Sequence, residues 1–178
     1  MQTILVALDG SKAAYKALEV ALDLAKQHKA KVVLLHVLLR EKDPEELLRL
    51  SDLALAGPGL AEKLNSLSLV KRTERTAEEI MADPGAPDRQ VPEAVLRKVA
   101  AFVLRRGRAR ATKRRVRIEV LEPADGPAGP AIVAAAAAAG ANVIVMGSRG
   151  LRQIEAFTYG SVSQEVCRLA HATCIAVH

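Results

Sequence analysis

A loop of glycines and serines between Gly147 and Ser161 carries the clearest chemistry in this chain of 178 residues. The loop follows the apolar run NVIVM at 142–146 and precedes the helix-like run VSQEVCRLAHA at 162–172. Free backbone N–H groups and the helix dipole favour an anion at the start of such a helix, and glycine lets a phosphate approach the backbone. We therefore predict that this loop binds phosphate groups, with the hydroxyls of Ser161 and Ser163 as further donors.

Short apolar runs alternate with helical patterns along the chain. TILVAL at 3–8 has no polar alternation, which is typical of a strand buried on both faces of a parallel sheet. Further strands are predicted at 32–38, 116–122, 142–147 and 173–178. Helices are predicted at 12–28 with Ser11 as N-cap, at 43–57 with Pro44 in the first turn, at 60–82, at 91–106, over the alanine run that Gly140 closes, and at 161–172.

This order of elements predicts a doubly wound α/β domain that spans 1–178. We expect a five-stranded parallel sheet in the order 3-2-1-4-5, Rossmann-like, with a helical insert at about 41–91 between strands 2 and 3. Strands 1 and 4 are neighbours in that order, so Asp9 and Gly147 would face one crevice at the carboxyl ends of the strands. Asp9 either contacts a ligand there or only caps the first helix.

The glycine loop has a distinctive spacing: Gly147, two residues, Gly150, nine residues, Gly160 and Ser161. This spacing resembles the G-2x-G-9x-G-(S/T) pattern of the universal stress protein family, in its ATP-binding branch. The segments ILVALDGS, LLHV, VIVMGSRG and GSVS support the resemblance, which covers roughly the first 40 and the last 60 residues. It does not extend over 40–115, where the insert is longer than the family leads us to expect.

The resemblance implies ATP as the ligand, with Mg²⁺ or Mn²⁺ as an ion that could bridge the phosphates. It implies that Asp9 and the backbone of Val37 hold adenine and ribose, and that Met146 lies near the base. Ala7 departs from the family, since nucleotide-binding relatives often carry proline there. The residues implied to surround the phosphates are Gly147, Gly150, Gly160, Ser161, Val162 and Ser163.

A regulatory module that responds to nucleotide is the function this resemblance implies, and a stress protein that binds no nucleotide is the alternative. We expect slow hydrolysis or none, because no lysine occurs in the glycine loop and no acidic cluster is visible to hold a metal ion. The apolar last strand, 173–178, would form an exposed edge, which favours a homodimer by two-fold pairing.

A basic run at 105–117 holds eight basic residues and no acid, and the chain has a formal net charge of +6. Without these eight, 18 basic residues face 20 acidic ones, a balance of about −2. The run is either a solvated helix end or a surface for nucleic acid or an acidic partner. Phe102 is the only aromatic residue nearby, so no stacking platform accompanies the charge.

Other classes of protein are disfavoured by what the chain lacks. Cys167 and Cys174 form no CxxC pair, which indicates a reducing, cytoplasmic setting without a disulfide framework or zinc site. The apolar segment 131–146 is shorter than the roughly 20 residues that cross a bilayer, so no membrane span is expected. Walker-type and nucleophile-elbow motifs are absent, and His36 is interpreted as a core histidine.

Overall fold

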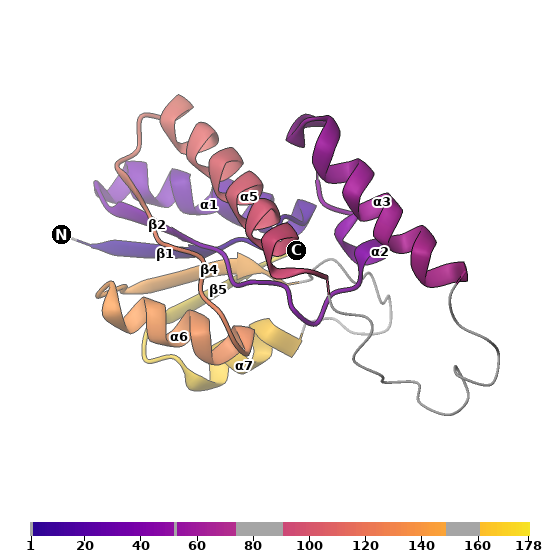
Figure 1. Ribbon diagram of the computed structural model, residues 1–178. Coiled ribbons are helices and arrows are strands. Elements are labelled where there is room, and N and C mark those ends of the chain that lie inside the picture. The colour runs from indigo at the N-terminus through magenta and orange to yellow at the C-terminus, as the bar shows by residue number, and fades with distance from the viewer. Residues whose placement is uncertain (1, 52, 74–90, 149–160) are drawn as a thin grey trace.

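The computed structural model describes residues 2–51, 53–73, 91–148 and 161–178 (Figure 1). Five parallel strands form one sheet in the order β3-β2-β1-β4-β5, which confirms the predicted order. The central strand, β1, is the first in sequence and lies between β2 and β4, so the strand order reverses beside it. The strands are β1 Thr3–Ala7, β2 Lys31–Leu35, β3 Ile118–Val120, β4 Val143–Gly147 and β5 Thr173–Val177.

Helices cover both faces of the sheet, as the doubly wound pattern requires (Figure 1). α1 (Lys12–His28) and α5 (Glu93–Lys113) pack on one face, and α6 (Ala128–Ala138) and α7 (Ser161–Leu169) pack on the other. Successive side chains of β1 point to opposite faces of the sheet. Val6 packs in the core under α1, and Leu5 packs in the core under α6. Both residues are fully buried.

α1 follows directly from the sequence pattern that predicted it. Its bounds agree with the predicted 12–28, and the Ser11 hydroxyl accepts a hydrogen bond from the Ala14 N–H at 3.1 Å. The helix ends where Lys29 adopts a left-handed conformation with φ of 52°. The buried residues recur at helical spacing: Ala14, Tyr15, Ala17, Leu18, Ala21, Leu22 and Ala25.

The insert between β2 and β3 contains α2 (Pro44–Leu47), the 3₁₀ helix η1 (Leu53–Ala56) and α3 (Pro58–Thr73). The prediction of one helix over 43–57 is wrong. Pro44 does lie in the first turn of the shorter helix α2, and Asp43 caps that helix. The chain leaves the helix because the Ser51 N–H donates to the carbonyl of Gly10 at 2.9 Å, and Leu50 is buried there. A tertiary contact thus outweighs local propensity.

Other element bounds differ from the expectations in ways that matter for the basic run. α5 continues to Lys113 rather than ending near Arg106, so five of the eight basic residues of that run lie on a helix. β3 has three residues instead of the predicted 116–122, and it is an edge strand with one neighbour. The end of the predicted helix 60–82 lies outside the described residues.

The last part of the chain agrees closely with its pattern. Gly140, with φ of 61°, closes α6 as predicted, and α7 begins at Ser161. α7 is shorter than predicted, because it ends at Leu169 rather than at Ala172. Within the part of the chain that the structure describes, no helix has the length and apolar character needed to cross a bilayer.

Candidate functional site

The candidate site begins at the carboxyl ends of β1, β2 and β4. Ala7 pairs in register with Leu35 of β2 and with Met146 of β4. Asp9, Val37 and Gly147 follow these paired residues by one or two positions, so all three lie at the same edge of the sheet. These three residues therefore lie at the edge beside the reversal of strand order, where the sequence analysis predicted a ligand crevice.

Asp9 lies in the turn between β1 and α1. Its Oδ1 accepts a hydrogen bond from the Ser11 N–H at 2.9 Å, so the carboxylate holds the turn that precedes the helix cap. Burial raises the pKa of the Asp9 carboxyl above its usual value, and the hydrogen bonds from Ser11 lower it in part. Ser11 rather than Asp9 caps α1, so Asp9 stabilises the turn before the helix, and this role is compatible with the ligand contact that the resemblance implies.

Gly10, the next residue, has φ of 87° and sits against the insert. A Cβ at this position would collide with Leu50 Cδ2 and would lie 2.9 Å from Val103 Cγ2. The backbone conformation therefore favours glycine, and a side chain here would also displace two buried side chains. This packing fixes the turn that carries Asp9 between the insert and α5.

Val37 extends the sheet beyond β2 through an isolated bridge to Ala124. The Ala124 N–H donates to the His36 carbonyl at 2.9 Å, and the Leu38 N–H donates to the Ala124 carbonyl at 2.8 Å. Val37 is buried, and its backbone is ordered by these bonds. The resemblance assigned this backbone to the adenosine, so its fixed position is what that assignment needs.

An ion-pair network that the sequence did not predict supports this loop. Arg40 donates to both carboxylate oxygens of Asp125 at 2.6 Å, and its Nη2 also donates to Glu93 at 3.0 Å. Arg40 lowers the pKa of Asp125 to about 2. The network connects the loops after β2 and β3 with the start of α5. No spacing rule could find residues 85 positions apart in the chain.

His36 is fully buried at the end of β2, beside the site. Its Nδ1 lies 2.7 Å from the Leu8 carbonyl, which can only accept, so Nδ1 carries the proton. Nε2 is buried and has no hydrogen-bond partner among the described residues. Burial lowers the pKa of His36 to about 4. The predicted core histidine is therefore confirmed in place, but only one of its two ring nitrogens is satisfied.

Gly147 ends β4 at the point where α1 passes close to the sheet. A Cβ at Gly147 would lie 2.9 Å from the Ala14 nitrogen and 3.0 Å from the Ala13 carbonyl carbon. Those atoms belong to the helix backbone and cannot rotate away. The structure thus gives a packing reason for this glycine, in addition to the phosphate contact that the resemblance implies. Met146, which precedes it, is buried.

Ser148 connects the end of β4 with α7 and with the chain end. Its N–H donates to the Val177 carbonyl at 2.8 Å, and its hydroxyl lies 2.8 Å from Nδ1 of His178. The buried Ser163 hydroxyl donates to the Ser148 carbonyl at 3.5 Å. The first turn of α7 therefore lies against the residue that follows β4.

The remaining predicted site residues differ in what the structure says of them. Ser161 and Val162 are exposed on the first turn of α7, where free backbone N–H groups are expected. Gly150 and Gly160 lie outside the described residues. Within the described ranges, His, Cys, Asp and Glu side chains form no group of three that could hold a metal ion.

Several solved structures share the fold of this chain. A universal stress protein complexed with cAMP superposes with a TM-score of 0.58 at 22% identity, covering 99% of this chain and 97% of that one. The universal stress protein from Archaeoglobus fulgidus complexed with dAMP gives 0.57 at 18% identity, with 100% and 98% covered. A family protein from Arabidopsis thaliana with AMP bound gives 0.55 at 14% identity, with 99% and 91% covered.

At these identities the structural likeness establishes the fold alone. Among proteins with curated descriptions, none is significantly similar to this chain in sequence. The family model of the universal stress proteins, in contrast, matches residues 1–178. That match includes the insert, which the sequence motifs alone did not cover. The chain is therefore a member of the universal stress protein family.

Proposed function

We propose that this protein binds ATP at the carboxyl edge of its sheet and acts as a regulatory module that responds to nucleotide. The observation that carries the proposal is the convergence of Asp9, Val37 and Gly147 with the first turn of α7, which the Ser163–Ser148 hydrogen bond links to β4. A helix start beside the ends of parallel strands suits a phosphate group. Relatives complexed with dAMP, AMP and cAMP support an adenine nucleotide.

In this proposal the two ends of the nucleotide meet different parts of the edge. Asp9 and the Val37 backbone bind adenine and ribose, and Met146 lies near the base. The phosphates bind along Gly147, Gly150, Gly160 and the start of α7 with Ser161, Val162 and Ser163. A carboxylate suits ribose because its oxygens accept from hydroxyl groups. Any Mg²⁺ or Mn²⁺ would be held mainly by the phosphates.

Isothermal titration with ATP, ADP and AMP tests the assignment. We expect saturable ATP binding, and we expect Gly160→Leu to abolish it while the circular dichroism spectrum stays unchanged. Gly59→Leu is the matched control, since nothing lies within 4 Å of a Cβ at Gly59. ATP binding that is undetectable at about 1 mM, a free energy weaker than about −4 kcal/mol, would favour a stress protein that binds no nucleotide.

Slow turnover is part of the same proposal. Hydrolysis needs a group that positions water in line with the γ-phosphate and a charge that offsets the developing negative charge. Asp9 is assigned to the adenosine end, and Glu165 lies against α6, where a Cβ on Gly129 would collide with its carboxylate. A phosphate-release assay with magnesium should stay below about 0.1 per second, far under the typical enzyme median of about 10 per second.

We further propose a homodimer formed through residues 173–178. β5 is an edge strand, and its residues from Cys174 to Val177 are half-buried in the single chain. An apolar edge strand can pair with its copy about a two-fold axis. Light scattering at micromolar concentration should give twice the mass of 19.0 kDa, and a monomer would contradict the proposal.

A further inference from the structure

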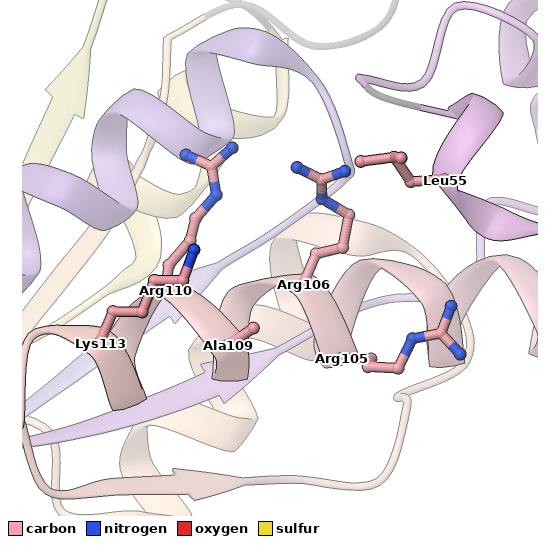
Figure 2. A pocket seen from close by; sticks show the side chains of 6 residues that line it. All are labelled: Leu55, Arg105, Arg106, Ala109, Arg110 and Lys113. Carbon is pink, nitrogen blue, oxygen red and sulfur yellow. The ribbon is translucent and has the colours of Figure 1, made fainter.

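A pocket of about 440 Å³ lies between α5 and η1, away from the residues named for the nucleotide site. Four basic side chains from α5 line it together with two apolar ones. Figure 2 shows Arg106 and Arg110 extending from α5 in one direction, while Leu55 reaches towards Arg106 from the insert. The lining residues are Leu55, Arg105, Arg106, Ala109, Arg110 and Lys113.

Two of the arginines are held in place by aromatic rings. The guanidinium carbon of Arg110 lies 4.5 Å from the centroid of the Tyr15 ring, and that of Arg106 lies 5.8 Å from Tyr15 and 5.9 Å from Phe102. Arg110 also donates to Glu19 at 3.4 Å. Cation–π contacts with buried rings restrict these planar groups, so less entropy is lost when they bind an anion.

The other two cations, Arg105 and Lys113, are exposed on the outer side of α5. Neither forms a salt bridge with a residue that the structure describes, and none of the described residues that line the pocket is acidic. Arg105, Ala109 and Lys113 follow one another at intervals of four, so they share a face of the helix. Four cations around one hollow raise the local concentration of an anion.

Apolar surface adjoins this charge. Leu55 is 68% exposed, and Ala109 is exposed as well. The volume falls within the roughly 300–1,000 Å³ range of small-molecule sites. Arginine forks match phosphate oxygens, and the apolar side chains can contact an organic portion of the same ligand.

The surroundings do not favour nucleic acid in the same place. Base stacking needs an accessible aromatic face, and the aromatic rings at this site, Tyr15 and Phe102, are both 3% exposed and lie beneath the arginines. We propose that the pocket between α5 and η1 is a second ligand site, which binds a small molecule carrying two or more phosphate groups.

Titration with inorganic tripolyphosphate at about 50 mM salt tests the site, since it supplies the phosphates without a base. Two double variants that lose the same charge distinguish binding in the pocket from general attraction of anions to the basic run. Arg105→Gln with Lys113→Gln removes the two exposed cations that line it. Arg108→Gln with Arg115→Gln removes two exposed cations of the same run that do not line it.

We expect one tripolyphosphate per chain, with binding weakened at least about tenfold by the first pair and less than about twofold by the second. Equal weakening by both pairs, or no saturable binding, would overturn the proposal. Unchanged binding in the first pair would also overturn it, because the phosphates would then bind elsewhere. A 20-residue single-stranded RNA serves as the rival probe. Tighter binding of RNA than of tripolyphosphate, sensitive to both pairs, would assign the run to nucleic acid instead.

The two proposed sites can fail independently. The test of the sheet edge uses ATP and Gly160→Leu, whereas this test uses tripolyphosphate and variants on α5. Loss of ATP binding in the Arg105 and Lys113 variant would show that the two sites are one, and would contradict a second site.

Discussion

The carboxyl edge of the sheet and the outer face of α5 are two regions that could each bind phosphate, and they are built in opposite ways. At the sheet edge the described groups are backbone atoms, glycine, serine and buried side chains such as His36 and Ser163. On α5 the groups are long cationic side chains, and two of the four that line the pocket are exposed. One region offers dipoles fixed by the fold, and the other offers full charges in contact with water.

Because of this difference, the two regions should respond to different changes in sequence and solution conditions. Fixed dipoles in a buried setting respond to small changes in packing and to the protonation of buried groups. Exposed charges tolerate substitution but are screened by salt. The arginines beside the pocket are partly neutralised from α1, because Glu19 accepts from Arg110 and Arg114, and Asp23 lies 3.1 Å from Arg114.

The largest expected effect concerns His36 and the pH dependence of stability. Its pKa falls to about 4 in the fold, so the unfolded chain binds the proton more readily. Stability is therefore complete above the ordinary value of about 6.5 and is lost as pH falls towards 4, by on the order of 3 kcal/mol. His36→Gln keeps a donor for Leu8 and should flatten this part of the profile.

Urea unfolding at several pH values between 7 and 4.5 measures the effect. His28→Gln is the control, because His28 is exposed and should leave the wild-type profile unchanged. Parallel profiles for the wild type and His36→Gln would mean that His36 is not the group that carries the loss.

Gly147→Ala tests the close packing of the sheet edge against α1. The added methyl would meet helix backbone at 2.9 Å, and overpacking of this kind costs about 1–3 kcal/mol. Gly59→Ala, in open space on α3, should instead be neutral or stabilise by up to about 1 kcal/mol. Chemical denaturation measures both. Equal stability of the two variants would show that the edge can adjust to a side chain.

The salt dependence of ligand binding should differ between the two regions. Raising salt from about 50 to 300 mM should weaken tripolyphosphate binding on α5 by about tenfold or more, because exposed cations are screened. ATP binding at the sheet edge should weaken by only about threefold, since the proposed site consists mainly of backbone groups and a helix terminus. Isothermal titration at both salt concentrations decides. The same salt dependence for both ligands would remove the distinction between the regions.

The smallest expected effect lies among the surface ion pairs between α1 and α5. Glu19→Gln removes the negative charge that pairs with two arginines, yet half-exposed ion pairs contribute little to stability. The melting temperature should change by no more than about 2 °C. Tripolyphosphate binding should become slightly tighter, because Arg110 loses a competing anion. A drop of more than about 5 °C would instead make these pairs part of the structural core.

The sequence by itself determined the strands, their parallel sheet and the edge at which the candidate site is proposed. Apolar runs such as 3–8 can be satisfied only by burial on both faces, and Ser11 and Gly140 mark helix ends through contacts within four residues. The order 3-2-1-4-5 then brings Asp9 and Gly147 to one edge. The glycine spacing also identified the family, which the match over the whole chain confirms.

The tertiary structure alone decided what depends on contacts between distant residues. The Ser51–Gly10 hydrogen bond breaks the predicted helix at 43–57, and α1 packs so closely on β4 that Gly147 has no space for a side chain. The pocket likewise forms only because the insert places Leu55 beside Arg106 (Figure 2). Local patterns describe how one element is built. They carry no record of which face of one element meets which face of another, and that meeting is what gives these residues their roles.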